Sequence, residues 1–380
     1  MTSGAAKNVK LDFPGFVDVH VHFRDPGTPE AETTASGLEA ARRGGFAAVV
    51  TMPNTTPACD SVETMEHQLA ARRRVWDERR GTRDEGSSTP ILIPSACITK
   101  GRRGEEVADI ERLADAGAAF FTDDGSYVAS DKVMEAAMKR IAALDMVACQ
   151  HALPQTAGVI RDCALARRLG LPIVSASAEA DAIRRDLSIC RVTGCRLHVQ
   201  HISTAEGVEL VRAAQKEGLP VTAEATPHHL LLCCDDLTED DSNFKMAPPL
   251  GNREDRAELR RAVKDGVLMF ATDHAPHSAA KKSGGFRAAA NGIIGLETAI
   301  PITYGVMVEE EGMSPDAWAR AWHDMPLSII SESALAGVRD ELGRTVVEVG
   351  EERAVDVSSF ASLSRNCPYD GMKWRCWPCS

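Results

Sequence analysis

The stretch Val17-Asp18-Val19-His20-Val21-His22-Phe23 lies in the first predicted strand, and it carries two candidate metal ligands. Because side chains alternate across a strand, His20 and His22 point to one face, while the intervening valines point to the other and can pack. Two imidazoles that converge at the end of a strand can bind one metal ion. Taken alone, the pattern also fits two packed or surface histidines, so the rest of the chain has to distinguish these alternatives.

Seven further short apolar runs follow the first strand, with longer amphipathic stretches between them. The eight predicted strands are Phe16–Phe23, Ala47–Met52, Ile91–Ile98, Ala118–Thr122, Met146–Gln150, Leu197–Ile202, Val221–Ala225 and Val267–Thr272. The predicted helices are Thr33–Arg43, Ser61–Arg80, Glu105–Ala116, Ser130–Ala143, Ala178–Thr193, Thr204–Glu217 and Glu254–Asp265. Strands that alternate with helices predict parallel βα units of the α/β class, and eight strands are the number that closes a (β/α)8 TIM barrel.

Length and composition limit the classes of function. The 380 residues are enough for a TIM barrel, which takes about 250 residues. A formal net charge of −12 argues against nucleic-acid binding, although a few local cations can still bind a small anion. The eleven scattered cysteines are typical of reduced thiols, and no apolar run approaches the ~18 residues of a membrane span. We therefore expect a cytoplasmic protein that binds neither nucleic acid nor membrane.

Candidate ligands also stand at or near the ends of later strands. They occur at the fourth, fifth, sixth and eighth predicted strands, as Asp124, His151, His201 and Asp273. In a parallel barrel the carboxyl ends of all strands face one rim, so these side chains gather with His20 and His22. Four histidines and two carboxylates suit Zn²⁺ or a similar divalent ion. Chance placement at four further strand ends is improbable, which favours a metal centre over packed histidines.

Three other features carry weaker predictions. If His201 points to the metal, strand alternation places His198 on the opposite face of its strand. The loop Ala279–Gly292 follows the last strand, where active-site loops belong, and we expect it to act as a lid. The pair Cys376-Trp377-Pro378-Cys379 is a single C-x-x-C, which we interpret as incidental rather than as a redox or zinc site.

The segment Phe13–Gly27 closely resembles the opening motif of dihydroorotases, which are members of the amidohydrolase superfamily. Further motifs of this family follow in the same order, at Thr51–Thr55, Phe121–Gly125, His201–Thr204, Thr222–Leu230, Ala271–His277, Gly295–Thr298 and Ser364–Gly371. The resemblance is to the bacterial type I branch. Related enzymes bridge two metals with a carboxylated lysine at the fourth strand, whereas the type I branch uses the aspartate that maps to Asp124.

The resemblance implies a TIM barrel of the metal-dependent amidohydrolase type with an accessory β-sandwich element. It implies reversible cyclisation of N-carbamoyl-L-aspartate to L-dihydroorotate, a step of pyrimidine biosynthesis, with one or two Zn²⁺ ions as cofactor. The metal residues of the family map to His20, His22, Asp124, His151, His201 and Asp273. Asp273 is also implied to move the proton in catalysis. The substrate-binding residues map to Arg24, Asn54, His277 and Gly292.

The sequence departs from the family pattern at the substrate site. Ala247 stands where the family has a substrate-binding asparagine, and Ala290-Asn291-Gly292 replaces Pro-Phe-Gly. After the ligand His151, the usual Cys-Glu-Asp is replaced by Ala152-Leu153-Pro154. Because a hydrogen bond to a charged ligand contributes about 1.5–3 kcal/mol, we expect weaker substrate binding than is usual for the family.

The ends of the chain are short against the family pattern. We expect residues 1–13 to be a remnant of the β-sandwich, residues 14–337 to form the barrel and residues 338–380 to be a remnant or tail, so that the sandwich is truncated. Three functions stay open: an active dihydroorotase, a catalytically weak subunit that scaffolds aspartate transcarbamoylase, and a related hydantoinase-like or allantoinase-like enzyme. The expected partners are a small anionic substrate, aspartate transcarbamoylase, and further copies of the chain in a homo-oligomer.

Overall fold

The computed structural model describes residues 8–80, 89–154 and 158–379 of the chain. Residues 1–7 of the expected N-terminal remnant therefore lie outside the described residues, as does Ser380. In the described part of the chain, no helix combines the length and the apolar character needed to cross a membrane.

Each of the eight predicted strands forms, and together they make two parallel sheets. The first sheet contains, in this order, β2 (Phe16–Val21), β3 (Phe46–Thr51) and β4 (Ile91–Pro94). The second contains, in this order, β5 (Phe121–Thr122), β6 (Val147–Gln150), β7 (Arg196–Val199), β8 (Val221–Ala225) and β9 (Met269–Phe270). Single parallel bridges link the two sheets at both of their edges, from Ala96 to Phe121 and from Val21 to His274.

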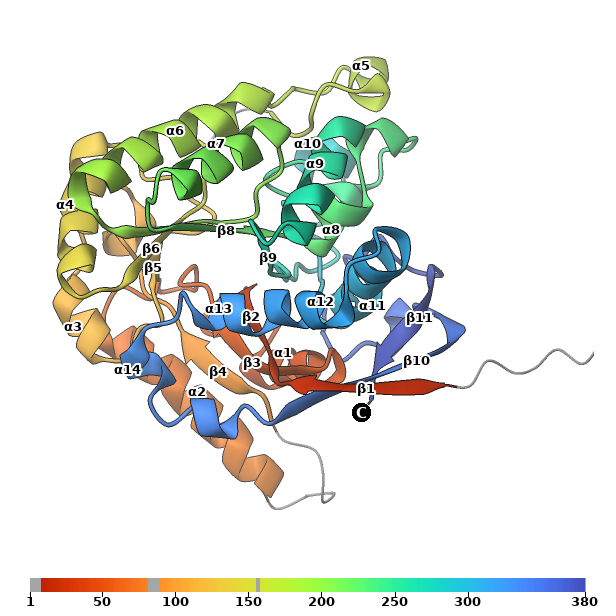
Figure 1. The fold of residues 1–380 in the computed structure, drawn as a ribbon, viewed down its shortest axis with the longest axis horizontal. Coiled ribbons are helices and arrows are strands. Elements are labelled where there is room, and N and C mark those ends of the chain that lie inside the picture. Colours follow the sequence, from red (N-terminus) through yellow and green to blue (C-terminus); the bar gives the residue numbers. More distant parts are fainter. Residues whose placement is uncertain (1–7, 81–88, 155–157, 380) are drawn as a thin grey trace, which may run out of the picture.

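All seven predicted helices form. They are α1 (Thr34–Arg43), α2 (Val62–Arg80), α3 (Ile110–Asp115), α4 (Asp131–Ala143), α6 (Ala176–Thr193), α7 (Ala205–Lys216) and α9 (Arg253–Lys264). Figure 1 shows α4, α6 and α7 outside the strands β5, β6 and β8. Helix α3 begins later than predicted because the segment before it pairs with the end of the third predicted strand: Ala108 N donates to Ile98 O at 2.9 Å.

Short helices that the sequence pattern did not predict fill the later loops. They are α5 (Ala164–Leu169), α8 (Pro227–Leu231), α10 (Gly285–Ala288), α11 (Ala299–Thr303), α12 (Pro315–Trp322), α13 (Asp324–Leu327) and α14 (Glu332–Leu335). A π-helical turn, Tyr304–Glu310, extends α11.

At the rim, side-chain acceptors take over from backbone carbonyls beyond the ends of two strands. At the end of β9, the Thr272 amide donates to Asp18 Oδ1 at 3.1 Å instead of to a strand carbonyl. Beyond β4, the Thr99 amide donates in the same way to Asp123 Oδ1 at 3.0 Å. A side-chain acceptor satisfies the amide without continuing the ladder, so the chain is free to turn into a loop at the rim.

A bulge in β2 determines which of its side chains face inward. Asp18 pairs with Val49, and Val21 pairs with Thr51. Between these two pairs, β2 therefore has one residue more than β3. Val19 packs in the smaller cluster, which holds strand residues together with a few from the segment around α14, whereas Val21 packs in the larger cluster shared with the surrounding helices. The valines on either side of His20 therefore lie in different cores, and the bulge lets His20 and His22 share the inner side.

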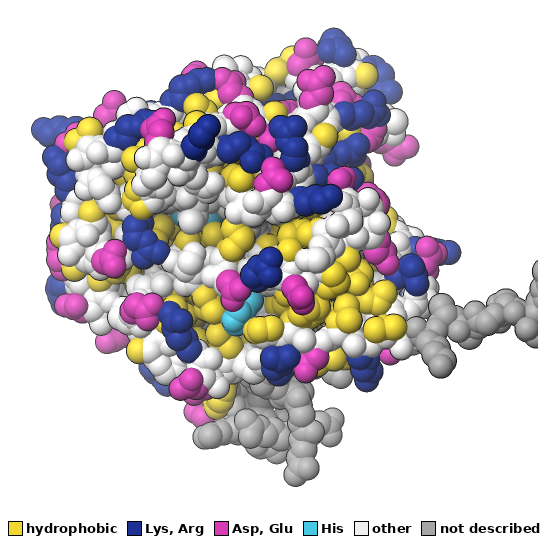
Figure 2. All heavy atoms as spheres, in the orientation of Figure 1, with side chains coloured by type: hydrophobic (Ala, Val, Ile, Leu, Met, Phe, Trp, Pro, Cys, Tyr) yellow, Lys and Arg dark blue, Asp and Glu magenta, His cyan; other side chains and the backbone are white. Residues whose placement is uncertain are grey.

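A third, antiparallel sheet joins the two ends of the chain. Its order is β1 (Val9–Pro14), β10 (Arg344–Ala354) and β11 (Lys373–Pro378). The C-terminal tail is thus part of a sheet, with Cys376 paired to Val349 and both Cys376 and Cys379 free thiols. Figure 2 shows hydrophobic side chains gathered near α11, α12 and β11, where this sheet packs against the helices.

Candidate active site

His20 in β2 and His22, which follows the end of β2, approach one buried carboxylate, Asp124, which follows β5. The Nε2 atom of His20 lies 3.4 Å from Asp124 Oδ1, and that of His22 lies 3.3 Å from Asp124 Oδ2. All three side chains are buried. The rim therefore brings together residues about one hundred positions apart in the sequence, as the strand pattern predicts.

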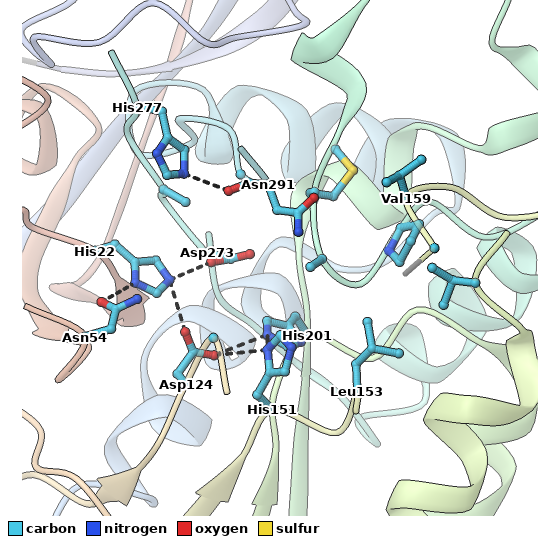
Figure 3. A pocket seen from close by; sticks show the side chains of 18 of the residues that line it. His22, Asn54, Asp124, His151, Leu153, Val159, His201, Asp273, His277 and Asn291 are labelled. Carbon is cyan, nitrogen blue, oxygen red and sulfur yellow. Dashed lines mark hydrogen bonds and ion pairs between the residues drawn. The ribbon is translucent and has the colours of Figure 1, made fainter. Parts of the chain in front are cut away.

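A second pair of histidines lies on the other side of Asp124 (Figure 3). His151 Nδ1 and His201 Nε2 are 3.5 and 3.3 Å from Asp124 Oδ1, and 2.9 Å from each other. Asp124 thus belongs to two groups of three residues, and in each group the ligand atoms lie within 4.8 Å of one another. Asp124 is therefore a candidate ligand in both groups.

Asp273 completes the set of six predicted metal residues. Its Oδ1 atom lies 2.9 Å from His22 Nε2 and 3.5 Å from His20 Nε2. The backbone is left-handed at Asp273, with φ 49°, and at His201, with φ 33°. Such conformations cost on the order of 1–3 kcal/mol per residue and cluster at functional sites. The surrounding structure therefore holds both side chains against their local backbone preference.

Unpartnered atoms show that these side chains fit a divalent metal ion. His20 Nε2 and Asp124 Oδ1 are buried, and neither has a hydrogen-bond partner among the described residues. Glu224 Oε1 accepts from His20 Nδ1 at 2.5 Å, and Asn54 Oδ1 accepts from His22 Nδ1 at 2.9 Å. With Nδ1 held in this way, each imidazole turns its Nε2 atom toward Asp124, where that nitrogen could bind a metal ion. Histidines that bind metal typically use one ring nitrogen in this way while the other is held by an oxygen.

A pocket of about 420 Å³ opens onto this centre (Figure 3). Its wall includes the four predicted substrate residues, Arg24, Asn54, His277 and Gly292. It also includes every predicted metal residue except His20, which is fully buried. Ala247 and Asn291, where the chain departs from the family pattern, line the same pocket. The structure thus places the predicted metal and substrate groups in one site.

Arg24 and His277 give the pocket one cation and one neutral imidazole. Burial lowers the pKa of Arg24 to about 10, so its guanidinium stays charged at neutral pH. Burial, followed by the charge of Arg24, lowers the pKa of His277 to about 3. His277 Nε2 lies 2.7 Å from the Asn291 carbonyl, which can only accept, so this nitrogen carries the proton. The wall around Arg24 suits a small anion.

Sequence comparisons decide the family. Residues 9–207 match the family model described as dihydro-orotase-like. The chain is 42% identical over 379 residues to the dihydroorotase of Geobacillus thermodenitrificans, covering 97% of this chain and 85% of that protein. The chain belongs to the dihydroorotase family. The dihydroorotase of Listeria innocua is 39% identical over 380 residues, with 97% of this chain and 85% of the relative covered. Like other dihydroorotases, the chain is a metal-dependent cyclic amide hydrolase.

Solved structures of cyclic amide hydrolases share the fold of this dihydroorotase family member. The L-hydantoinase of Arthrobacter aurescens matches with a TM-score of 0.79 at 24% identity, covering 97% of this chain and 83% of that one. The dihydroorotase of Saccharomyces cerevisiae, solved with 5-fluoroorotic acid, matches with a TM-score of 0.74 at 17% identity. The match covers 97% of this chain and 98% of that one. At these identities the likeness establishes the fold alone.

Glu224 is a residue of the dihydroorotase site that the sequence reasoning missed. Besides His20, it accepts from His198 Nε2 at 3.0 Å and from the His201 amide at 3.1 Å. Burial would raise the pKa of Glu224, but His20 and His198 outweigh burial and hold it below its usual value. The sequence does carry a signal for it, because Glu224 is the one charged residue in strand β8.

The prediction for His198 was wrong. Its ring nitrogens contact Thr222 and Glu224, so it faces the same interior as His201 rather than the opposite side of the strand. Strand β7 ends at Val199, and His201 has a left-handed backbone. Alternation with period two therefore stops before His201, and counting back from it gives the wrong face.

Proposed function

We propose that the chain catalyses the reversible cyclisation of N-carbamoyl-L-aspartate to L-dihydroorotate in pyrimidine biosynthesis. The observation that carries this proposal is the single pocket in which Arg24 faces a carboxylate shared by two histidine pairs. The pocket joins a binding group for an anion to a centre that can activate water. Membership of the dihydroorotase family indicates which ring these groups would open and close, namely that of L-dihydroorotate.

The proposed cofactor is Zn²⁺, as one or two ions. His20, His22 and Asp273 would hold one ion, and His151 with His201 a second, with Asp124 between them. Imidazole nitrogens and carboxylate oxygens are the ligands of catalytic zinc. When bound, zinc lowers the pKa of water towards ~7 and polarises a carbonyl oxygen.

Asp273 is the proposed general base and acid. In the hydrolytic direction its carboxylate takes a proton from the attacking water and passes it to the ring nitrogen as the amide bond breaks. In cyclisation the same carboxylate removes a proton from the carbamoyl nitrogen and returns it to the departing water. Asp273 lines the pocket and lies against His22, so it reaches both the substrate space and the metal residues.

Arg24 is the proposed anchor for the substrate carboxylate, because its planar fork matches two carboxylate oxygens. Its Nε atom donates to the Pro276 carbonyl at 3.0 Å, which leaves the terminal nitrogens for the ligand. Asn54 and His277 would bind beside it. Gly292 would allow the backbone to come close to the substrate: its φ is 126°, and a Cβ atom there would lie only 2.6 Å from the Ala275 Cβ.

We also propose that the strands β2 to β9 form one closed barrel over residues 14–337. The two single bridges between the sheets support closure. The three-stranded sheet of β1, β10 and β11 would then correspond to the accessory β-sandwich, with residues 1–13 and 338–380 as its parts. A cytoplasmic location is part of this proposal, because all eleven cysteines are free.

The alternative is a catalytically weak subunit that scaffolds aspartate transcarbamoylase. Ala247 favours it, since the pocket wall offers a methyl group there instead of an amide. Homo-oligomers are expected under both proposals. Light scattering of the purified chain, alone and mixed with aspartate transcarbamoylase, measures both associations directly.

The test of the proposed function is turnover by the purified, zinc-analysed protein. Hydrolysis of L-dihydroorotate at alkaline pH and cyclisation of N-carbamoyl-L-aspartate at mildly acidic pH are both expected. Turnover of hydantoin or allantoin in place of dihydroorotate would contradict the proposal. Bound zinc without turnover, with activity appearing only when aspartate transcarbamoylase is added, would support the scaffold instead.

A further inference from the structure

Asn291 and Gly292 are among the pocket residues in the loop between β9 and α11, and Figure 3 shows Asn291 on the side of the pocket where His277 lies. The Asn291 carbonyl also fixes the His277 ring through the 2.7 Å contact to Nε2. Short stretches without regular structure have many conformations of similar energy. Something outside this stretch therefore has to hold it in the one conformation that shapes the pocket.

Lys282 holds the stretch from within the same loop. Its side chain is only 7% exposed. The Nζ atom donates to three carbonyl oxygens, those of Gly292 at 2.9 Å, Ala290 at 3.1 Å and Lys245 at 3.3 Å. An ammonium group has three hydrogens, so every donor of Lys282 is used on backbone. Two of the three acceptors flank Asn291.

A second buried lysine holds the stretch from the segment that precedes Ala247. Lys245 is 5% exposed, and its Nζ atom donates to the Ala289 carbonyl at 2.5 Å. Its own carbonyl accepts from the Gly292 amide at 3.0 Å. The two lysines thus bind the carbonyls of Ala289, Ala290 and Gly292, and they connect the two pocket walls to each other.

Neither ammonium group lies within 4.0 Å of a carboxylate in the part of the chain that the structure describes. The charge of Asp241 acts on Lys282 only from beyond ion-pair distance. Burying a cation without a close counter-charge is unfavourable, and an apolar side chain of the same length would avoid that cost. The carbonyl contacts compensate only in part. A residue that merely filled space here would be better uncharged, so the charge points to a role in the site.

We propose that Lys282 is a positioning residue for substrate binding, which fixes the Ala290–Gly292 backbone and through it His277. The proposal rests on the proposed function and names a determinant of its substrate affinity. Lys282 acts through the loop: it holds the two carbonyls that flank Asn291, and the Asn291 carbonyl in turn holds the His277 ring.

The test compares Lys282→Met with Lys281→Met, because the neighbouring Lys281 is exposed and serves as a matched control. We expect Lys282→Met to raise KM for L-dihydroorotate about tenfold, the effect of losing one charge-assisted hydrogen bond, with little change in kcat. Zinc content and Tm should not fall. Lys281→Met should behave as the unaltered protein. A Lys282→Gln variant, which keeps a donor, should lie between the two.

Amide hydrogen exchange provides a readout that does not depend on activity. The amides of Ala290 and Gly292 are hydrogen-bonded in the loop. They should exchange faster in Lys282→Met and be unchanged in Lys281→Met. Unchanged exchange, or a KM that stays the same in both Lys282 variants, would overturn the proposal. If the unaltered protein turned over no dihydroorotate, the proposed function would fail, while the exchange data would still decide whether Lys282 holds the loop.

Discussion

Glu224 and His20 form a 2.5 Å contact on the side of the imidazole that faces away from Asp124. Glu224 accepts a hydrogen bond from Nδ1 and so turns the Nε2 atom toward Asp124. Both residues are buried, so water does not compete for the contact between them. The affinity for metal should depend on Glu224 even though Glu224 belongs to neither group of predicted ligands.

Glu224→Gln should weaken zinc binding by about 10- to 100-fold, the usual effect of removing an oxygen that orients a metal-binding histidine. The glutamine keeps the shape but loses the charge. Zinc retained against a graded series of chelator concentrations measures the change. Glu258→Gln is the matched control, because Glu258 is also buried but pairs with Arg212. Equal zinc retention in both variants would contradict the orienting role.

Asp273→Asn should keep most of the metal and lose turnover. An amide oxygen can still approach the ion, but the side chain can no longer take a proton from water. General acid–base catalysis contributes about 10²- to 10⁴-fold, and kcat should fall by that amount. Zinc analysis and single-turnover kinetics on the same sample separate binding from chemistry. A near-normal kcat would show that another group moves the proton.

Ala247→Asn should lower KM for L-dihydroorotate by about tenfold, because it adds a hydrogen-bonding amide to a pocket wall that now offers only a methyl group. Steady-state kinetics of this variant and of Asn291→Ala should be measured together. An unchanged KM in Ala247→Asn, with a raised KM in Asn291→Ala, would mean that the Asn291 amide already provides the missing contact.

Lys282 should make stability depend on pH. Burial, reinforced by Lys245, lowers its pKa from 10.5 to about 8 in the folded protein. Between about 8 and 10.5 the unfolded chain binds more protons than the folded chain, so the free energy of unfolding rises with pH through this window. The full effect is on the order of 3 kcal/mol.

Denaturant unfolding at a series of pH values checks this prediction. Relative to the unaltered protein, Lys282→Met should be more stable below about pH 8 and should lose that advantage as pH approaches 10.5. Lys281→Met serves as the control for a change of surface charge. A stability difference that does not vary with pH would indicate that Lys282 is not a buried cation.

The eight strands and the convergence of six side chains could be predicted because both depend on local regularities. Short apolar runs between helices indicate parallel strands, and parallel strands end at one rim. Asp124 and Asp273 are 149 positions apart, yet they lie 3.4 and 3.5 Å from His20 because each follows the end of a strand. The prediction for His198 failed where that regularity ends, at the close of β7.

Features that depend on distant pairing could not be predicted from local patterns in the chain. Strand β1 pairs with β10 across more than three hundred residues, and no local pattern in Val9–Pro14 indicates this partner. Lys281 and Lys282 are adjacent residues of the same type, yet Lys281 is exposed and Lys282 is buried. Only the approach of Lys245 and of the Gly292 carbonyl distinguishes them.

The sequence by itself determined the strand–helix order, the family and the residue types available at the rim. The tertiary structure decided how those residues are oriented: the bulge that turns His20 and His22 inward, the Glu224 contact behind His20, and the buried cation of Lys282 under the pocket wall. Periodicity is a property of neighbouring residues and can be read from the amino-acid sequence. Orientation and burial are properties of distant segments in contact, and they exist only once the chain has folded.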